Sequence, residues 1–332
     1  MRLSRPLPLV SFETIMRQPL PPIAWEVEPL IAQGDRALVY GRSGSLKSWL
    51  LLHLGLHLAA GSPWFGKFDI AQPRRVLYIN EEMHERTLRR RIKRLGLGAG
   101  FEGLSLPFHA VSRVGVKFDG QGAEDLLRAL EASAFDPEVV IVEALRRVLV
   151  GNENEAKDVS AFWRNVEPLR EAGKTLLVSH HMRKGGSRAK VDGFVLASGS
   201  TDLLAGVDTA FAVRRDTARN AVKIEPVKSC EVEEPEAFIV SLIDEGGNSP
   251  VEMRLESFMG DAPPEDTEVR KAYRLITEFL SQQPERTAKK GEVLEGLEQH
   301  GVRQRTGERA LEDLAHRGRI KKAKYGHWQL VG

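Results

Sequence analysis

The residues best suited to chemistry form one loop, Gly41-Arg-Ser-Gly-Ser-Leu-Lys47-Ser48. An apolar run, residues 36–40, precedes this loop, and a second apolar run, residues 50–60, follows it. A glycine-containing loop that joins a strand to a helix and ends in Lys-Ser is the arrangement of a phosphate-binding loop. Backbone N–H groups of such a loop converge on an anion. We therefore expect Lys47 to neutralise phosphates and the Ser48 hydroxyl to bind Mg²⁺.

The predicted nucleotide site includes the whole loop and the residue after it. The residues expected to line it are Gly41, Arg42, Ser43, Gly44, Ser45, Leu46, Lys47, Ser48 and Trp49. Leu46 stands where the pattern G-x-x-x-x-G-K-[ST] has its second glycine, and leucine tolerates a positive φ poorly. An ordinary strand–turn–helix with a chance Lys-Ser is the alternative interpretation.

Acidic residues follow two further strand-like runs. Residues 75–79 lead to Glu81 and Glu82, and residues 138–142 lead to Glu143. The carboxyl ends of parallel strands meet at the ligand crevice of an α/β sheet. There we expect Glu82, or as second choice Glu81, to polarise the water that attacks the terminal phosphate. We expect Glu143 to hold the Mg²⁺. Acids that only stabilise a helix dipole, or a purely structural Glu143, are the alternatives.

Another apolar run, residues 174–179, ends in His180-His181. A polar residue at this place can contact the γ-phosphate and transmit its loss to the next loop, and we predict this role for His180. A neutral core histidine is the alternative. The next loop is glycine-rich and free of acids, which suits contact with a nucleic-acid backbone, although a solvated surface loop has the same composition. Its predicted DNA-binding residues are Arg183, Lys184, Arg188 and Lys190.

Three later strand-like runs are separated by turn signals and predict an antiparallel extension of the sheet. These runs are residues 207–213, 221–227 and 237–243. Lys228 closes the second run, and Arg214 and Arg215 close the first. Cations at strand ends can reach the nucleotide of an adjacent subunit, as arginine fingers do. We predict this role for Lys228, and a basic turn residue is the alternative.

The bulk composition is that of a soluble globular protein. The chain has 332 residues, of which 42% are hydrophobic and 28% charged, enough for one large core and a small second domain. The single cysteine, Cys230, excludes an intrachain disulfide and fits a reducing compartment. Neither a membrane-spanning run nor the apolar segment of a secretory signal is expected. We therefore predict a cytoplasmic protein that has no membrane partner.

Changes in composition divide the chain into four parts. Residues 1–33 are rich in proline and are expected to form an extended arm, laid on the core or on a neighbouring subunit. Residues 34–259 carry the α/β pattern described above. Residues 260–266 have the composition of a linker. Residues 267–332 are basic, with 14 Lys and Arg against 9 Asp and Glu.

The basic C-terminal part has the pattern of a winged helix. Amphipathic helices are expected over residues 269–282, 289–300 and 306–317, and a short hairpin over residues 319–331. Basic residues near the start of the third helix and on the hairpin suit contact with duplex DNA. The predicted contacts are Arg303, Arg305, Arg309, Lys321 and Lys322. A protein-docking module is the alternative, since winged helices also serve that purpose.

The order of these motifs resembles the RecA-like hexameric ATPases. The P-loop, Y-I-x-x-E, V-V-I-V followed by an acid, L-V-S-H-H and the basic glycine-rich loop carry the resemblance over about residues 20–245. It is closest to the plasmid RepA-type replicative helicases, with DnaB-type helicases, RadA and KaiC further off. The resemblance implies a RecA-like P-loop NTPase core with helices on both faces of a mostly parallel sheet. It also implies ATP with Mg²⁺ at subunit interfaces and a homo-oligomer, expected to be a hexamer, around single-stranded DNA.

The resemblance also implies roles for single residues. Lys47 and Ser48 match the Walker A pair, and Glu82 matches the catalytic glutamate. Two further matches are Glu143 as the Walker B acid and His180 as the γ-phosphate sensor. Residues 183–190 match the central DNA-binding loop. Lys228 matches the first member of a Lys-x-Arg finger pair, whose second position is Cys230 here. In that case the trans-acting arginine is absent, or Arg214 or Arg215 supplies it.

The function predicted from these features is that of an ATP-dependent DNA translocase or helicase in plasmid or phage replication. One alternative is a DNA-binding regulator or loader that uses ATP as a slow switch. A RadA-like recombination ATPase is the other alternative. The departures from the family patterns at Leu46, Glu143 and Cys230 concern fast hydrolysis more than nucleotide binding.

Overall fold

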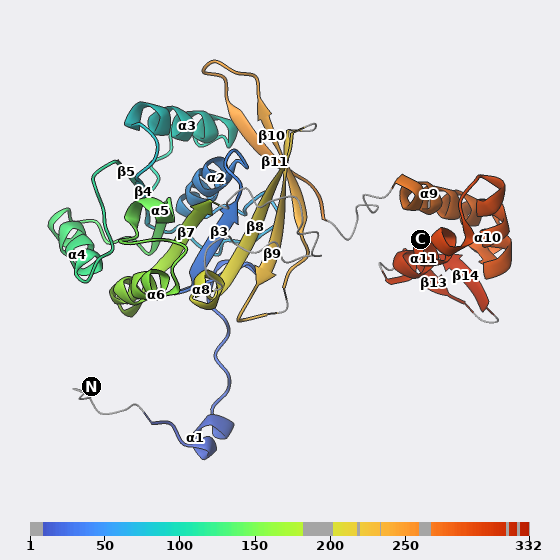
Figure 1. The fold of residues 1–332 in the computed structure, drawn as a ribbon, viewed down its shortest axis with the longest axis horizontal. Helices are drawn as coiled ribbons and strands as arrows, with labels where there is room; N and C mark the ends of the chain where they lie inside the picture. Colours follow the sequence, from blue (N-terminus) through green and yellow to red (C-terminus); the bar gives the residue numbers. More distant parts are fainter. Residues whose placement is uncertain are drawn as a thin grey trace.

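The computed structural model describes residues 9–181, 202–217, 220–232, 234–258, 267–316, 319–323 and 326–331. A nine-stranded sheet forms the centre of residues 25–258, in the order β11-β10-β9-β8-β3-β7-β6-β4-β5 (Figure 1). Its strands are β3 (Arg36–Gly41), β4 (Val76–Asn80), β5 (Phe108–Ser112), β6 (Val139–Glu143), β7 (Thr175–His181), β8 (Thr209–Asp216), β9 (Ala221–Lys228), β10 (Phe238–Asp244) and β11 (Val251–Phe258).

Six neighbouring strands of this sheet, from β8 to β5, run parallel. Strand β7 lies between β3, which leads into the P-loop, and β6, which ends in Glu143. The carboxyl ends of β3, β4, β6 and β7 therefore meet at one edge of the sheet, where α/β proteins bind ligands. This architecture confirms the expected α/β core with a mostly parallel sheet.

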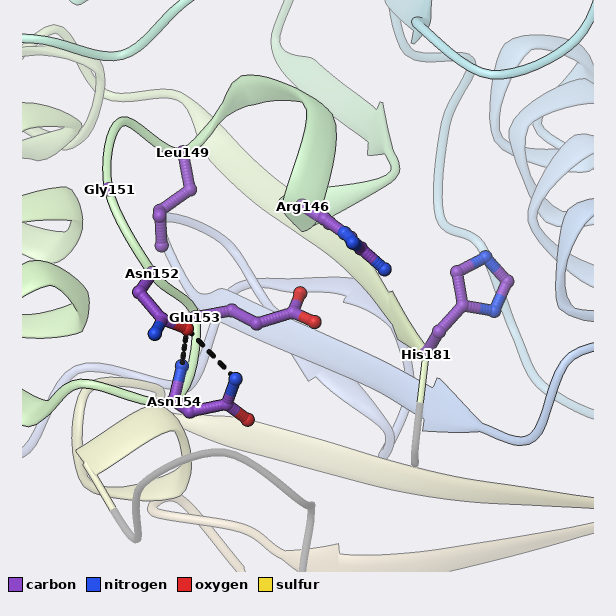
Figure 2. A pocket seen from close by; sticks show the side chains of 7 residues that line it. All are labelled: Arg146, Leu149, Gly151, Asn152, Glu153, Asn154 and His181. Carbon is purple, nitrogen blue, oxygen red and sulfur yellow. Dashed lines mark hydrogen bonds between the residues drawn. The ribbon is translucent and has the colours of Figure 1, made fainter. Parts of the chain in front are cut away.

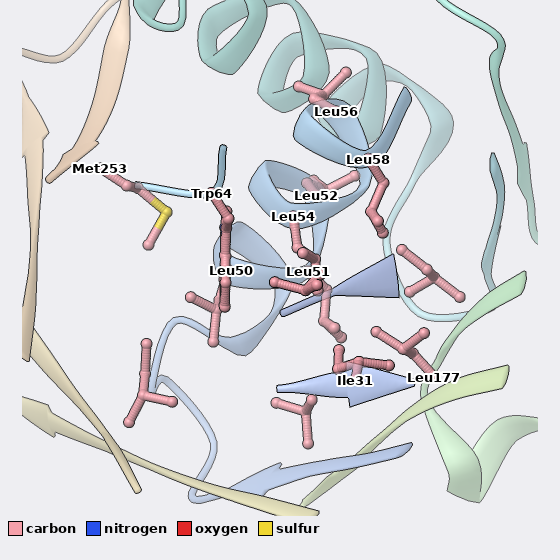
Figure 3. Close-up of a cluster of buried hydrophobic side chains, with 14 of the residues drawn as sticks. Ile31, Leu50, Leu51, Leu52, Leu54, Leu56, Leu58, Trp64, Leu177 and Met253 are labelled. Atoms are coloured by element: carbon pink, nitrogen blue, oxygen red, sulfur yellow. The ribbon is translucent and has the colours of Figure 1, made fainter. Parts of the chain in front are cut away.

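Helices cover both faces of the sheet (Figure 1). One face packs against α2 (Lys47–Ala60) and α3 (Glu85–Gly98). The other face packs against the remaining helices of the core. These are α4 (Gly122–Ala132), α5 (Leu145–Val148), α6 (Ala156–Asn165), α7 (Glu167–Glu171) and α8 (Asp202–Ala205). Figure 3 shows the leucines of α2 inside the first of these two hydrophobic layers.

Side chains alternate between the two layers along each parallel strand, as the period of a strand requires. On β4, Tyr78 lies in the α2 layer and Leu77 in the opposite layer. On β6, Ile141 lies in the α2 layer and Val142 in the opposite layer. The same alternation decides which polar residues at the strand ends face the P-loop.

The antiparallel extension begins one strand later than the sequence predicts. Strand β8 pairs parallel with β3 and so belongs to the parallel part of the sheet. Strands β9, β10 and β11 then pair antiparallel. Strand β11, at the edge of the sheet, has no counterpart in the sequence prediction.

The N-terminal part contains one segment that packs on the core and one that is exposed. Strands β1 (Trp25–Val27) and β2 (Ile31–Ala32) form a small antiparallel pair, and Val27 and Ile31 are buried in the α2 layer of the core. Residues 25–32 thus pack with the core, one of the two placements expected for the arm. By contrast, every residue of the short helix α1 (Phe12–Arg17) is exposed.

The C-terminal part has a hydrophobic core of its own, formed within residues 272–330. Its elements are α9 (Thr267–Gln282), the 3-10 turn η1 (Pro284–Arg286), β12 (Thr287–Lys289), α10 (Lys290–Gln299), α11 (Gln304–His316), β13 (Ile320–Lys322) and β14 (His327–Leu330). The three strands form an antiparallel sheet in the order β12-β14-β13. Strand β12 is not part of the sequence prediction, and the winged-helix assignment stays a prediction. Within the described ranges, no helix is both long and apolar enough to cross a bilayer.

Candidate nucleotide site

The loop between β3 and α2 depends on three unusual backbone positions. Gly44 has φ +79°, which costs a glycine little. At Gly41 an added Cβ would lie 2.2 Å from the carbonyl oxygen of Val213, so strand β8 leaves room only for glycine. Leu46 itself adopts φ 67° and ψ 16°, the left-handed conformation. Its side chain packs against the hydrophobic core, which compensates for the strain of that conformation.

The N-terminus of α2 offers its N–H groups to an anion. The N-cap residue is Leu46, which makes no side-chain cap, so within the described part of the chain the first N–H groups have no acceptor from that residue. Lys47 is 4% exposed, and its ammonium donates to the carbonyl oxygens of Gly41 at 2.9 Å and Arg42 at 3.0 Å. Burial lowers the pKa of Lys47 to about 8, partly offset by Glu143 and Glu82. Lys47 is therefore still mainly a cation at neutral pH.

The hydroxyl and carboxylate predicted to bind Mg²⁺ lie in contact. Ser48 donates a hydrogen bond to Glu143, and the hydroxyl of Tyr78 donates to the other oxygen of the same carboxylate. Glu143 is 2% exposed, and burial raises the pKa of its carboxyl, opposed by these two hydrogen bonds. The alternation along β4 and β6 explains the meeting, because Tyr78 and Glu143 both face the α2 layer.

Glu82 is joined to the P-loop lysine through a histidine. The His181 Nε2 atom lies 3.1 Å from the Glu82 carboxylate, and its Nδ1 atom lies 3.3 Å from the Lys47 ammonium. The hydrogen bond with His181 holds the pKa of the Glu82 carboxyl below its usual range, against the opposing effect of burial. Glu82 is thus an ionised carboxylate beside the P-loop, as a general base must be.

His181 occupies the place that the sequence analysis assigned to His180. Position 177 of β7 lies in the α2 layer and position 178 in the opposite layer, so the odd-numbered His181 faces the P-loop. His180 is fully buried, with its Nδ1 atom 3.8 Å from the Glu153 carboxylate. Strand alternation, applied with α2 placed on one face, is the sequence signal that would have selected His181.

Glu81, the second choice for the catalytic carboxylate, has a structural role in this arrangement. Its carboxylate accepts hydrogen bonds from the backbone N–H groups of Gly115 at 3.0 Å and Val116 at 3.1 Å. These contacts hold the loop after β5 against the end of β4. Because the Glu81 carboxylate is used for this purpose, the structure favours Glu82 for the chemistry.

The predicted finger residues have partners within the chain. Lys228 donates to the carbonyl oxygens of Leu204 at 2.9 Å and Val207 at 2.6 Å, so it closes the end of α8. Arg215 donates weakly to the carbonyl oxygen of Gly44, at 3.4 Å. Arg214 and Arg215 also line a cavity of about 570 Å³ between β8 and the P-loop. A contact of these cations with a neighbouring subunit stays a prediction.

A second cavity, of about 470 Å³, lies on the other side of His181 (Figure 2). It lies at the carboxyl ends of β6 and β7 and has a mostly polar lining. The residues that line it are Arg146, Leu149, Gly151, Asn152, Glu153, Asn154 and His181. Of these, the sequence analysis singled out only the histidine.

The predicted DNA-binding residues fall into two groups. Arg183, Lys184, Arg188 and Lys190 lie outside the residues that the structure describes. The C-terminal group is described and exposed, with Arg305 and Arg309 on α11, Arg303 just before it, and Lys321 and Lys322 on β13. Lys322 also lies over the ring of Trp328, with Nζ 5.4 Å from the ring centre.

The residues present fit a magnesium nucleotide. An uncapped helix N-terminus and a buried lysine held by carbonyl oxygens leave positive charge at the loop. The hydroxyl of Ser48 and the carboxylate of Glu143 are oxygen donors of the kind that Mg²⁺ prefers. Among the described residues no group of three or more His, Cys, Asp or Glu is placed to hold a metal by itself.

Comparison with solved structures finds similar folds at low sequence identity. A solved ATPase domain is 12% identical, with 64% of this chain and 82% of its own covered and a TM-score of 0.49. A DnaB-like replicative helicase is 13% identical, with 64% of this chain and 57% of its own covered and a TM-score of 0.49. A KaiC-like protein from Pyrococcus horikoshii is 13% identical, with 70% of this chain and 94% of its own covered and a TM-score of 0.45. Such likenesses say nothing of activity, which depends on the site.

No curated protein matches the sequence. A family model does match: the model described as an AAA domain covers residues 2–187, more than half of the chain. This range contains the P-loop, Glu82, Glu143 and His181, the residues that the fold brings together. By this match the chain belongs to the AAA domain family.

Proposed function

We propose that this protein is an ATPase that acts on DNA, a translocase or helicase of the RepA type used in plasmid or phage replication. One observation carries the proposal. Lys47, Ser48, Glu82 and Glu143 converge at the carboxyl edge of the sheet, although 96 residues of sequence separate the first from the last. A cation, a hydroxyl and two carboxylates at a helix N-terminus suit hydrolysis of a nucleoside triphosphate.

Each of these residues has a task in that reaction. Lys47 and the N–H groups of α2 bind the β- and γ-phosphates and orient the terminal group. Glu82 accepts the proton of the attacking water, because its carboxylate is ionised and is joined to the phosphate-binding lysine through His181. Ser48 and Glu143 would hold Mg²⁺, which when bound neutralises charge on the phosphate oxygens.

The decisive experiment compares two lysine variants. We expect Lys47→Ala to lower the rate of Mg²⁺-dependent ATP hydrolysis at least about 100-fold, because the cation at the phosphates is lost. Lys93→Ala removes an exposed lysine of α3 and should leave the rate unchanged. Binding of a fluorescent ATP analogue is measured in parallel. Hydrolysis that persists in Lys47→Ala means that the P-loop is not the active site.

The DNA contacts are assigned to two places. We propose that single-stranded DNA contacts the loop after β7, and that duplex DNA contacts the exposed cations of α11 and β13. Arg305→Ala with Arg309→Ala should weaken duplex binding and lower its salt dependence, since each phosphate contact releases counterions. Lys271→Ala, an exposed lysine of α9, is the matched control. An unchanged salt dependence in the double variant excludes α11 as the contact.

The proposal includes a homo-oligomer, expected to be a hexamer, with ATP between subunits. Native mass spectrometry with and without ATP and single-stranded DNA measures the size of the assembly. A monomer under all these conditions excludes catalysis by a neighbour's cation and the translocating ring together.

A DNA-binding regulator with slow turnover is the second candidate, and the strained Leu46 together with the intrachain contacts of Lys228 favours it. A forked duplex separates the two functions, because only a motor displaces a strand with ATP. Tight duplex binding with negligible turnover identifies the regulator. Strand-pairing activity would instead identify a RadA-like recombination ATPase.

A further inference from the structure

His181 lies between the nucleotide site and the polar cavity of Figure 2. On one side its two ring nitrogens contact Glu82 and Lys47. On the other side it lines the cavity together with Glu153 and Arg146. Its side chain is 32% exposed, so the ring is not packed tightly on all sides. A ring held by two polar contacts and bordered by a cavity can occupy two positions.

The partners of His181 determine where its proton lies. The Lys47 ammonium can only donate, so the Nδ1 atom that faces it must accept. The Nε2 atom then carries the hydrogen and donates it to the Glu82 carboxylate. In this arrangement Lys47 itself stabilises the tautomer that holds Glu82.

This hydrogen bond occupies the carboxylate that must receive the proton of the attacking water. While His181 donates to Glu82, that carboxylate is a weaker base, because hydrogen bonds to the charged form favour it. The hydrogen bond from His181 to Glu82 depends on Lys47. The Lys47 ammonium must leave His181 and contact the phosphates when a nucleotide binds. Without that donor, the ring loses the contact at Nδ1 that keeps it in place.

Glu153 offers a second acceptor across the cavity. Its side chain is 14% exposed, and among the described residues its buried Oε2 atom has no hydrogen-bond partner. The Nδ1 atom of His180 lies 3.8 Å from that oxygen, beyond hydrogen-bond distance. A buried carboxylate oxygen without a partner is costly, so a donor that reaches it is stabilised.

We propose that His181 is a positioning residue for the Glu82 carboxylate. While Lys47 faces the ring, His181 donates a hydrogen bond to Glu82 and keeps this carboxylate from acting as the base. When Lys47 turns to a nucleotide, His181 releases Glu82 and donates to the Glu153 carboxylate instead. The exchange replaces one carboxylate acceptor with another, so the Nε2–H group stays satisfied in both positions. The cavity of about 470 Å³ provides the space for the movement. This inference rests on the proposed ATPase function and adds the regulation of its general base.

Two single variants and their combination test the exchange through ATP hydrolysis without DNA. His181→Phe removes both hydrogen bonds and keeps a ring, so Glu82 is free and kcat should rise about tenfold. Glu153→Gln replaces the charged acceptor with an amide of the same shape, so His181 stays on Glu82 and kcat should fall about fivefold. The double variant should behave as His181→Phe, because Glu153 acts only through the histidine.

His109→Phe, the same change at an exposed histidine of β5, is the matched control and should leave kcat unchanged. Circular dichroism checks that every variant is folded at the assay temperature. A merely structural role would lower kcat in both single variants, and this result overturns the exchange. So does a kcat of His181→Phe that equals that of the wild type, or a double variant that is slower than His181→Phe.

Binding of a fluorescent ATP analogue to the wild type distinguishes failure of this inference from failure of the proposed function. No binding with Mg²⁺ contradicts the ATPase itself, whereas binding and turnover without opposite effects of the two variants contradict only the exchange.

Discussion

The N-terminal end and the middle of helix α2 hold buried ionisable groups in opposite ways. At the N-terminal end, Lys47 is buried and surrounded by carbonyl oxygens, and the pKa of its ammonium falls only to about 8. In the middle of the helix, His53 is covered by Trp64 and Phe65, which follow the C-terminal end of the helix, and Phe65 is stacked on it at 4.9 Å between ring centres. We call this region the aromatic end. Burial, with a smaller effect of the nearby His57, lowers the pKa of His53 to about 3. One end keeps its charge and the other loses it.

Burial is the largest cause of both shifts. The lysine stays charged because its ordinary pKa of 10.5 lies far above neutral and the Glu143 and Glu82 carboxylates partly offset the shift. His53 starts from an ordinary pKa of 6.5, and no carboxylate of the described residues offsets its burial. Trp64 donates its indole N–H to the Nδ1 atom of His53 at 3.0 Å, which leaves the hydrogen of the neutral ring on Nε2. His53 and His57 are four residues apart on one helix face, a spacing that suits a metal site. The hydrogen bond from Trp64 argues against one, since Nε2 is protonated. The aromatic end therefore serves stability, and the P-loop end is arranged for chemistry.

The largest effect on stability is expected at the aromatic end. Trp64→Ala removes a buried indole and leaves His53 without its donor, so the free energy of unfolding should fall by about 3–5 kcal/mol. Trp64→Phe keeps the ring and loses the hydrogen bond, which should cost about 1 kcal/mol. Urea unfolding measures both. A loss in Trp64→Ala no larger than in Trp64→Phe would contradict the packing role of the indole.

The complementary effect at the P-loop end should appear in activity and not in stability. Glu143→Gln should lower Mg²⁺-dependent turnover about 100-fold at neutral pH, because the proposed metal ligand is lost. The free energy of unfolding should stay the same or rise slightly, since a buried carboxyl with a raised pKa becomes a neutral amide. Steady-state kinetics and urea unfolding on one preparation test the contrast. Marked destabilisation would mean that Glu143 is mainly structural.

Acid should act selectively on the aromatic end. The pKa of His53 is about 3 in the folded chain against 6.5 ordinarily, so the unfolded chain binds more protons below pH 6.5. The neutral ring makes its full contribution to the free energy of unfolding above pH 6.5, and this contribution is lost as pH falls towards 3. The loss has reached about 2–3 kcal/mol at pH 4.5.

Asp35 acts in the opposite direction. Burial raises the pKa of its carboxyl from 3.8 to about 6. The contribution of Asp35 to the free energy of unfolding therefore falls as pH rises from 3.8 to about 6. The effect of His53 is therefore measured as the difference between the wild type and His53→Gln from pH 7 to pH 4.5. A difference that does not change with pH would contradict a neutral buried His53.

The smallest effect is expected for Leu46→Gly. Leucine in the left-handed conformation costs about 1–2 kcal/mol, and glycine removes this cost. The partly buried leucine side chain stabilises the core by a similar amount, which glycine loses. The free energy of unfolding should therefore change by less than about 1 kcal/mol, as measured by urea unfolding. A large loss would show that the leucine anchors the loop, and a large gain that the strain is uncompensated.

Much of the core could be predicted from local sequence. The apolar runs before Lys47, Glu81 and Glu143 are strands, because a parallel strand buried on both faces reads as a continuous apolar run. The motif order that predicted an α/β core of the RecA type is likewise local. Strand β11 is missing from the sequence prediction although its residues 251–256 alternate between apolar and polar side chains, which is the signal of a half-buried strand.

The residues around the site were harder to predict. Tyr78 was read only as part of a strand, yet the register of β4 with β6 brings its hydroxyl to Glu143. The choices between His180 and His181, and between Glu81 and Glu82, depended on which face of the sheet α2 covers and on where the loop after β5 lies.

By itself the sequence determined which residue types stand at the ends of which strands, because strand and P-loop patterns are local and depend on neighbours in the chain. Only the tertiary structure decided which of these side chains meet, since contacts between residues such as Lys47 and His181 need the helix layer and the strand register together. It also decided that a leucine could hold a left-handed conformation in the P-loop, because the energy that offsets the strain comes from the packed core.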